Sequence, residues 1–380
     1  MRPVPCAAFA LLVGGTGLLP AASAVAAPGP GPGPGPAIVA EPTSGGPPTP
    51  LVWRTGLTLH GAAVDGTGAR RLATVRGEAP TPSPDGRRVA LLADDQVLTL
   101  DLDGSGTVRT LGRARDATAL RWSPDGRRIA AVGYGPLTVC GAGPGVPAGC
   151  RATAVRAASE WGATWSPDST RVAVVDDDGA VVTSDGARTS VLARYRVRRS
   201  RVDLPSPPVW TRAGLVWTTQ VIRYEGGEFA GVGRAAVRRY DGAGRRVLAT
   251  VVPRGRTLQP FVAAGELPDG TLVGVRERVP RDDGSATAFD LRLLRPDGQL
   301  VDTAAKAGPF FPFRGTDQPA NASAAVAGTL ADGRVAFVVR RSETSRAQLY
   351  LADPAGGLGR RIVAADEIAV ATPLPGNPVE

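Results

Sequence analysis

The sequence predicts an all-β fold, a seven-bladed β-propeller built of four-stranded antiparallel blades. Three observations lead to this prediction. One strand–turn–strand pattern recurs along the chain, Asp-Gly turns fall between its copies, and a strand left over at the C-terminal end matches a strand missing at the N-terminal end. The 380 residues are within the length of one all-β unit.

The clearest copy of the repeat, WSPDGRRIAAV at residues 122–132, reads as a strand, a tight turn and a second strand. Ser123, Pro124 and Gly126 suit positions i, i+1 and i+3 of a type I turn. The other copies are SPDGRRVALL at 83–92, WSPDSTRVAVV at 165–175, WTRAGLVW at 210–217, LPDGTLVGV at 267–275 and LADGRVAFVV at 330–339. Successive turns are 40, 43, 45, 56 and 63 residues apart, which is the spacing of four-stranded propeller blades or longer.

A second kind of turn falls between these copies, where the third strand of a blade would lead into the fourth. Asp-Gly pairs occupy this place at residues 65–66, 103–104, 185–186, 241–242 and 297–298. We interpret them as hairpin turns whose two central residues both take positive φ. Residues 140–150 stand in this place in the third unit, and residues 353–356 do so in the seventh.

The first unit lacks its innermost strand. Residues 51–54, 57–60 and 69–75 provide three strands, and residues 368–373 provide one more strand after the last hairpin. Pairing the two ends completes the first blade and leaves no free sheet edge at the seam of the ring. The sequence therefore predicts that a C-terminal strand closes the ring by joining the N-terminal blade.

Four ranges follow from composition. Residues 1–27 have the charged start, the short apolar core and the small residues of a signal peptide, and residues 28–50 form a Pro/Gly-rich linker that we expect to be disordered. Residues 51–373 form the propeller and residues 374–380 a C-terminal tail. No other apolar run is long enough to span a membrane. We expect a secreted, extracytoplasmic protein of the cell envelope or periplasm.

The repeat resembles the Trp-Ser-Pro-Asp-Gly-(Arg/Lys)-(Arg/Lys)-Ile-Ala signature of the TolB-like, WD-repeat-related propellers. The resemblance is close at residues 122–130, good at 83–90 and 165–173, looser in the later blades, and covers most of residues 51–373. It implies an exported bacterial propeller that binds partners. TolB itself carries an additional N-terminal α/β domain, for which residues 28–50 leave no room.

Residues that would indicate catalysis are scarce. The Gly-x-Ser-x-Gly sequence of hydrolases that share such blades is missing, and His60 is the only histidine, which excludes multi-histidine metal sites. Residues 101–106 open like a calcium loop, but Gly112 stands where a bidentate Glu is required. We therefore expect no enzyme activity and no cofactor. The alternative is a propeller enzyme, a lyase or a sugar-acting enzyme, that uses carboxylates and a metal in the central channel.

Two cysteines remain once the predicted signal peptide is removed. Cys140 and Cys150 lie at the two feet of one predicted hairpin, in a chain that we expect to be exported. Oxidising compartments favour disulfides. The sequence predicts a Cys140–Cys150 bond that replaces the Asp-Gly turn of the third blade.

Candidate binding residues lie where blades are longer than the repeat requires. Four long segments, 194–207, 223–233, 276–287 and 305–322, fall in the fourth to seventh blades and on one face of the ring. A solvated charge run and loops folded onto their own blades are the simpler interpretation. The sharper hypothesis is a shared recognition surface, basic at one side and aromatic at the other. Its predicted binding residues are Arg194, Arg196, Arg198, Arg199, Arg201, Arg223, Tyr224, Phe310, Phe311, Phe313 and Arg314.

The formal net charge of +9 favours anionic partners if it is functional. Taken together, the sequence predicts a monomeric, non-catalytic module that binds a protein or an anionic cell-envelope polymer. Nucleic acid is not an expected partner.

Overall fold

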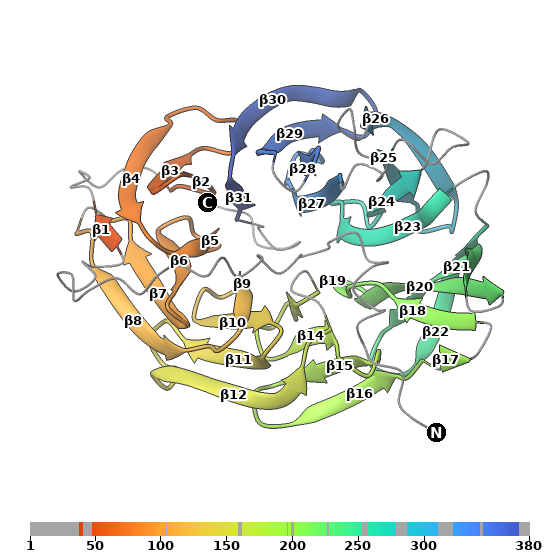
Figure 1. Cartoon of the computed structure of the whole chain (residues 1–380), viewed down its shortest axis with the longest axis horizontal. Coiled ribbons are helices and arrows are strands. Elements are labelled where there is room, and N and C mark those ends of the chain that lie inside the picture. The colour runs from red at the N-terminus through yellow and green to blue at the C-terminus, as the bar shows by residue number, and fades with distance from the viewer. Residues whose placement is uncertain are drawn as a thin grey trace.

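The structure is a computed structural model that describes residues 38–40, 48–103, 105–158, 162–195, 197–198, 201–225, 228–252, 257–278, 287–310, 322–342 and 345–371. All regular elements in these ranges are β-strands. They form seven antiparallel sheets arranged as blades around a central axis (Figure 1). The predicted seven-bladed propeller is confirmed.

Within each blade the strands are named from the axis outward. Blade 1 contains β31 (Glu367–Val370), β2 (Leu51–Thr55), β3 (Thr58–Ala62) and β4 (Arg70–Val75), with β1 (Ile38–Ala40) outside β4. Blade 2 contains β5 (Glu78–Pro82), β6 (Arg88–Ala93), β7 (Gln96–Asp101) and β8 (Val108–Arg113). Blade 3 contains β9 (Ala117–Trp122), β10 (Arg128–Gly133), β11 (Pro136–Gly141) and β12 (Gly149–Arg156). Blade 4 contains β13 (Thr164–Trp165), β14 (Val172–Val175), β15 (Val181–Ser184) and β16 (Thr189–Ala193).

The last three blades follow the same order. Blade 5 contains β19 (Val209–Thr211), β20 (Gly214–Glu225), β21 (Glu228–Tyr240) and β22 (Arg245–Val251), to which β17 (Val197–Arg198) and β18 (Arg201–Pro205) are added. Blade 6 contains β23 (Thr257–Glu266), β24 (Leu272–Arg278), β25 (Thr287–Leu294) and β26 (Leu300–Phe310). Blade 7 contains β27 (Ser323–Thr329), β28 (Val335–Arg340), β29 (Ala347–Asp353) and β30 (Gly357–Ala365).

The ring closes as predicted. Strand β31 pairs antiparallel with β2, so that Leu51 lies opposite Val370 and Arg54 opposite Glu367. Backbone bonds extend the pairing at both ends, from the Asp366 amide to the Arg54 carbonyl at 3.0 Å and from the Ala371 amide to the Pro50 carbonyl at 2.6 Å. Both ends of the described chain therefore contribute to blade 1.

One strand was not expected. Strand β1 pairs antiparallel with β4, with Ile38 opposite Val75, although the composition of residues 28–50 predicts a disordered linker. Ile38 is buried in the apolar cluster between blades 1 and 2. For these three residues the linker prediction is wrong, because a short apolar segment in this range finds a free strand edge and a core position.

The repeated SPDGRR turn has the predicted geometry. In blade 3 the Gly126 amide donates to the Ser123 carbonyl at 2.8 Å, which closes the turn, and Gly126 takes φ +65°. The Ser123 hydroxyl donates to the Asp125 carboxylate at 2.6 Å and accepts from the Arg128 amide at 2.8 Å. These residue types thus hold the turn by local hydrogen bonds.

Two tryptophans of the repeat pack between blades. The Trp122 indole donates to the Thr81 carbonyl of blade 2 at 2.9 Å. The Trp165 indole donates to the Arg121 carbonyl of blade 3 at 2.8 Å. Each ring is almost fully buried, so these aromatics belong to the core.

The Asp-Gly hairpins occur where the sequence places them, but their conformation differs from the predicted one. Gly66, Gly186, Gly242 and Gly298 take positive φ, whereas none of the aspartates that precede them does. The Gly298 amide donates to the Arg295 carbonyl at 2.9 Å, which places Asp297 at i+2 and glycine at i+3 of a type I turn. Only the glycine needs the left-handed conformation.

The predicted disulfide is present. Cys140 on β11 and Cys150 on β12 are opposite each other in the pairing of these strands and form a disulfide bond. Cys140 is buried in the apolar cluster between blades 2 and 3. The bond therefore joins neighbouring outer strands of a single blade.

Candidate functional site

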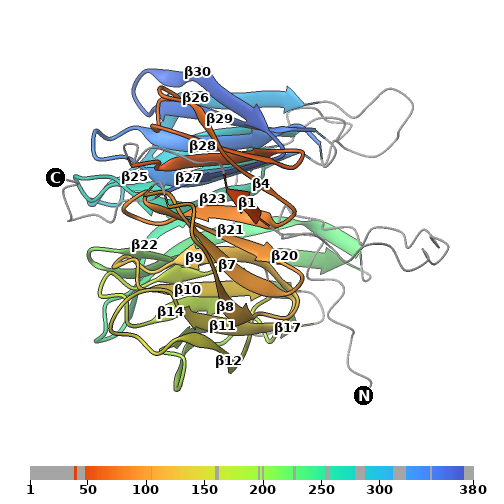
Figure 2. The ribbon, with the colours of Figure 1, turned by 90° about the vertical axis from the view of Figure 1, so that its left-hand side faces the viewer.

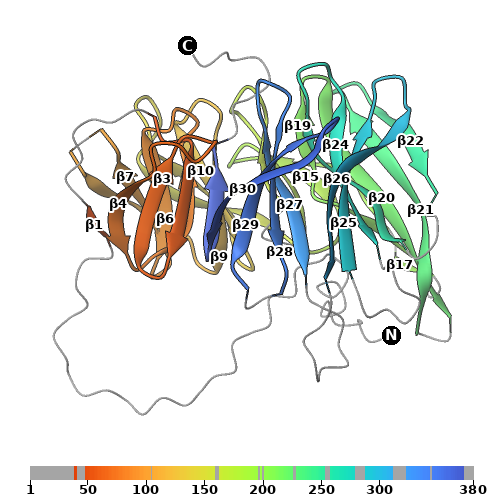
Figure 3. The same ribbon diagram turned by 90° about the horizontal axis from the view of Figure 1, so that it is seen from above.

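One face of the ring carries the four long segments. Because strands run antiparallel in chain order, connections between the second and third strands share a face with the passages from one blade to the next. We call this side, with residues 194–207, 223–233, 276–287 and 305–322, the insertion face, and the opposite side the turn face. The hairpin of β20 and β21 extends further from the disc than its neighbours (Figures 2 and 3).

The first two long segments combine into one sheet. The hairpin of β17 and β18 pairs with the outer half of β20, with Arg201 opposite Arg223 and Pro205 opposite Thr219. The innermost strand of the blade, β19, pairs with the other half of β20. The sheet β17–β18–β20–β21 therefore continues blade 5 beyond the ring, and we call it the extension sheet.

A small apolar cluster holds the extension sheet together. Val202, Leu204 and Ile222 are buried against one another. They come from β18 and β20, which bury these side chains on one side of the sheet. Packing as well as backbone pairing therefore fixes the added hairpin to the blade.

Tyr195 anchors the start of this hairpin. Its hydroxyl accepts hydrogen bonds from the Trp217 indole at 2.6 Å and from the Thr219 hydroxyl at 3.0 Å. Trp217 is fully buried, and the Arg238 guanidinium donates to Thr219 at 3.1 Å. The aromatic residue of the basic tract therefore has a structural role, and the chain turns outward just after it.

The structure places some of the predicted binding residues. Arg194 and Arg223 are exposed on the insertion face. Arg198, Arg201, Tyr224 and Phe310 lie in β17, β18, β20 and β26 respectively. Arg196, Arg199, Phe311, Phe313 and Arg314 lie outside the described residues. The pairing of β18 with β20 brings Arg201 to Arg223, so segments from two predicted insertions meet.

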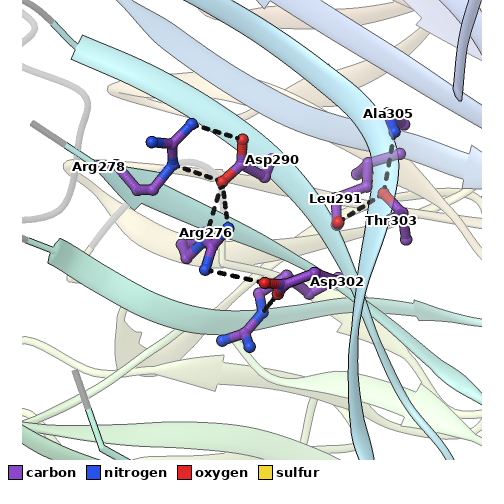
Figure 4. A network of polar contacts seen from close by, with 8 residues as sticks. Arg276, Arg278, Asp290, Leu291, Asp302, Thr303 and Ala305 are labelled. Carbon is purple, nitrogen blue, oxygen red and sulfur yellow. Dashed lines mark hydrogen bonds and ion pairs between the residues drawn. The ribbon is translucent and has the colours of Figure 1, made fainter. Parts of the chain in front are cut away.

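A buried carboxylate in blade 6 orders two arginines of the third insertion (Figure 4). Asp290 on β25 has a side chain only 1% exposed. Arg276 contacts it with N···O distances of 2.8 Å and 2.7 Å, and Arg278 binds both of its oxygens at 2.6 and 3.0 Å. Burial raises the pKa of Asp290, but hydrogen bonds from Arg278 and Arg276 outweigh burial and hold the pKa below its ordinary value.

The network continues to a more exposed aspartate. Asp302 on β26 binds the Arg292 guanidinium at 2.6 Å and lies 3.5 Å from a nitrogen of Arg276 (Figure 4). Three arginines thus face two carboxylates, which leaves one positive charge on a fixed array.

Sequence reasoning missed this array. The Arg-x-Arg alternation of residues 276 and 278 was its signal, since alternate residues of a strand share a face.

Glu277 points to the other side of the same strand. It is opposite Phe289 on β25, and Phe289 and Ala307 belong to the apolar cluster between blades 6 and 7. Burial raises the pKa of Glu277 to about 7. Within the described ranges no hydrogen bond or ion pair reaches its carboxyl group. Glu277 is therefore a proton-binding group on the insertion side of the ring.

Asp103, in the stretch that opens like a calcium loop, and Asp176, in the connection between β14 and β15, both hold local turns. Asp103 accepts hydrogen bonds from the Ser105 amide and hydroxyl at 2.9 and 2.6 Å. Asp176 accepts from the Ala180 amide at 2.7 Å, while burial raises its pKa and Asp178 and Asp177 add to the effect. In the part of the chain that the structure describes, no group of three or more His, Cys, Asp or Glu residues is arranged to hold a metal ion.

His60, the only histidine, lies in a stack. Its ring is parallel to that of Trp53, with centroids 5.3 Å apart and an interplanar angle of 8°. Burial lowers the pKa of His60, and the charge of Arg71 lowers it further. An imidazole that packs on an indole and has a lowered pKa fits a structural role for His60.

Together, the fold and the insertion face define the class of this protein as a seven-bladed propeller with one elaborated face. No protein-family model and no curated protein sequence matches the chain. No helix in the described ranges has the length and hydrophobicity that a membrane span requires.

Solved structures with similar folds come from proteins with different roles. A putative TolB from Agrobacterium tumefaciens is 14% identical with a TM-score of 0.35, over 62% of this chain and 83% of that one. The hydrazine synthase of Kuenenia stuttgartiensis is 14% identical with a TM-score of 0.45, over 72% and 76%. Dipeptidyl peptidase 4 of Porphyromonas gingivalis is 16% identical with a TM-score of 0.43, over 76% and 46%. Similarity at this level does not distinguish one propeller function from another.

Proposed function

We propose that the chain is an exported, TolB-like propeller that acts as a non-catalytic binding module and contacts a protein partner through the insertion face. The observation that carries the proposal is the extension sheet. It continues blade 5 beyond the ring on this face, where Arg201 and Arg223 stand opposite each other. A closed propeller does not need such a sheet for its own stability.

The composition of the insertion face favours a protein over a purely anionic polymer. Leu57, Tyr134 and Val252 are 56%, 60% and 68% exposed, and all three lie in connections on this face. Carboxylates stand among its arginines, as the exposed Asp177 does 3.7 Å from Arg156. Apolar anchors within a mixed polar surround are typical of protein interfaces.

The proposed export rests on two features. Residues 1–27, which lie outside the described residues, have the composition of a signal peptide. The Cys140–Cys150 disulfide fits an oxidising compartment. N-terminal sequencing of the mature protein tests this part of the proposal, which expects a start shortly after Ala26.

Binding to the partner captured from the native envelope tests the proposed surface. We expect replacement of Arg196, Arg198, Arg199 and Arg201 by Glu to weaken binding by at least about tenfold and to flatten its salt dependence, because exposed charges are screened over about 10 Å at 0.1 M salt. Replacement of Phe310, Phe311 and Phe313 by Ala should weaken binding at all salt concentrations, because apolar anchors dominate interface energetics.

The control is a charge reversal on the turn face. Arg87 and Arg127 are exposed there, and the double variant Arg87→Glu/Arg127→Glu should bind the partner as the wild type does. All variants should keep the wild-type melting temperature within a few degrees. If the insertion-face variants bind normally, the proposed surface is wrong. Stoichiometric metal in the purified protein together with turnover of a sugar polymer would instead support the propeller enzyme.

A further inference from the structure

The outermost strands of the blades carry charge of almost a single sign. Strands β4, β8, β12, β16, β22, β26 and β30 contain ten arginines and one lysine but only one acidic residue, Asp302. The whole chain has 44 basic and 35 acidic residues. A general bias of composition toward arginine therefore does not explain the ratio on these strands.

Six of these arginines are exposed and form no side-chain hydrogen bond or ion pair with the residues that the structure describes. They are Arg113, Arg151, Arg245, Arg246, Arg360 and Arg361. We call these six residues the basic rim. Arg109, by comparison, is paired with Asp101 at 2.9 Å, and the one acidic residue, Asp302, is bound by Arg292.

Protection of sheet edges does not require a single sign of charge. Charged residues on an outer strand discourage edge-to-edge pairing of sheets, and acidic residues or proline would serve this purpose too. Like charges on one molecule repel one another and destabilise the compact state. Protection of the sheet edges therefore does not explain why the outer strands have almost no acidic residues.

Two acidic groups in the hairpins next to the rim are already occupied by hydrogen bonds within their own turns. Asp241, in the hairpin that precedes Arg245 and Arg246, accepts hydrogen bonds from the Ala243 and Gly244 amides at 3.0 and 3.1 Å. Asp353, in the hairpin before Arg360, accepts from the Ala355 amide at 2.9 Å. These carboxylates hold their own turns, and the rim guanidiniums remain available to an external anion.

The outer strands follow one another along the perimeter, as Figure 1 shows for β30, β4, β8 and β12. Their exposed edges point away from the axis in a different direction in each blade. A flat bilayer would touch only neighbouring blades, whereas a flexible chain can follow the curve from blade to blade. Guanidinium groups bind phosphate oxygens in bidentate pairs.

We propose that the basic rim binds a linear phosphate-bearing polymer of the cell envelope, along the perimeter of the ring. Apart from Arg113, which ends β8 next to the passage into blade 3, this surface lies away from the insertion face, and the inference does not depend on the proposed protein partner. Binding of such a polymer would give a role to the excess positive charge on the outer strands, which the proposed protein contact does not explain.

The experiment uses the full chain and fluorescently labelled poly(glycerol phosphate) as the probe, with affinity measured from about 50 to 200 mM salt. The rim variants are Arg245→Gln/Arg246→Gln and Arg360→Gln/Arg361→Gln. The control variant, Arg87→Gln/Arg127→Gln, removes the same charge from the turn face. Each rim variant should bind about three- to tenfold more weakly at the lowest salt. Its slope of log affinity against log salt should be shallower by about one for each phosphate that the variant no longer binds.

Several results would overturn the proposal. The proposal is wrong if the rim variants bind the polymer as tightly as the wild type does. It is also wrong if the control variant loses as much affinity as the rim variants, because such a result would indicate an effect of net charge alone. Tighter binding to phosphatidylglycerol vesicles than to the polymer would identify a lipid surface instead. Retained binding of the polymer is expected for the variant with Phe310, Phe311 and Phe313 replaced by Ala, because that variant keeps the net charge, and this result separates the test of the rim from that of the insertion face.

Discussion

Arg128 of blade 3 donates a hydrogen bond to the backbone carbonyl of Ser169 in blade 4, with an N···O distance of 2.8 Å. Arg88 of blade 2 makes the equivalent bond to the carbonyl of Gly126 in blade 3 at 2.6 Å. The second arginine of the SPDGRR repeat thus joins a blade to the turn of the next one. The repeat is a feature of blade packing, which explains why it identifies the fold without identifying a reaction.

Replacing Arg128 by Ala should lower the free energy of unfolding by about 1–3 kcal/mol, because a charge-assisted bond to the carbonyl of the buried Ser169 is removed. Arg127→Ala is the matched control, since Arg127 is adjacent and exposed. It should change stability by no more than about 0.5 kcal/mol. Urea unfolding of both variants measures the difference, and equal losses would show that the inter-blade bond contributes nothing.

Truncation after Asp366 should open the ring. It removes β31, which pairs with β2 from Leu51 to Arg54, and breaks the Arg54–Glu367 ion pair at 2.9 Å. We expect a large fall in melting temperature or loss of cooperative unfolding. Glu367→Gln, which keeps the strand and removes only the ion pair, should cost no more than about 1 kcal/mol. A truncated protein that melts like the intact one would contradict closure through β31.

Peptide mapping of the native protein without reductant should recover one linked pair of peptides, which contain Cys140 and Cys150. Replacing both by Ser should leave the fold intact and lower the free energy of unfolding by about 2–3 kcal/mol, because the bond closes a short loop. Circular dichroism and thermal melts measure these effects. Recovery of two free thiols from the native compartment would contradict the assignment.

The Glu277 carboxyl should make stability depend on pH. Its pKa is raised to about 7 in the folded state, so the folded protein binds the proton more tightly than the unfolded chain does. The stabilisation that the protonated Glu277 carboxyl contributes is fully present at acidic pH. It is lost as pH rises from the pKa of Glu277 in the unfolded chain to its folded-state pKa of about 7, and it does not change further at higher pH.

Glu277→Gln removes the titrating group and should therefore remove this part of the pH dependence. The variant should gain about 1–3 kcal/mol relative to the wild type between about pH 5 and 8. Chemical unfolding at several pH values measures the difference. Asp290→Asn, which breaks a paired carboxylate, should destabilise at neutral pH instead. Parallel stability curves for wild type and Glu277→Gln would show that the carboxyl is solvated in solution.

Much of the fold could be predicted because the repeat is local. Ser123, Asp125 and Gly126 bond within their own turn, so the sequence alone specifies the geometry. The spacing of these turns then predicts the blades, and the leftover strand at 368–373 predicts the closure. The disulfide was predictable for the same reason, since its cysteines flank one hairpin.

What could not be predicted depends on distant partners. Strand β1 has only three residues and forms because β4 offers a free edge. The extension sheet depends on the pairing of β18 with β20 across the rest of blade 5. The contact of Arg276 and Arg278 with Asp290 depends on the register of β24 and β25. Parts of the predicted insertions therefore form strands, because the backbone amides and carbonyls of segments that extend beyond the ring still need hydrogen-bond partners.

The position of β31 also sets the order in which the molecule can be built. Residues of β2 emerge from the ribosome early, but the strand that pairs with their inner edge is 313 positions further along, as the Arg54–Glu367 contact shows. Blade 1 must therefore stay incomplete until nearly the whole chain has been synthesised. Contacts between such distant segments slow folding. During that interval the open edge of β2 is the surface on which a chaperone would act, and on which misassembly would begin.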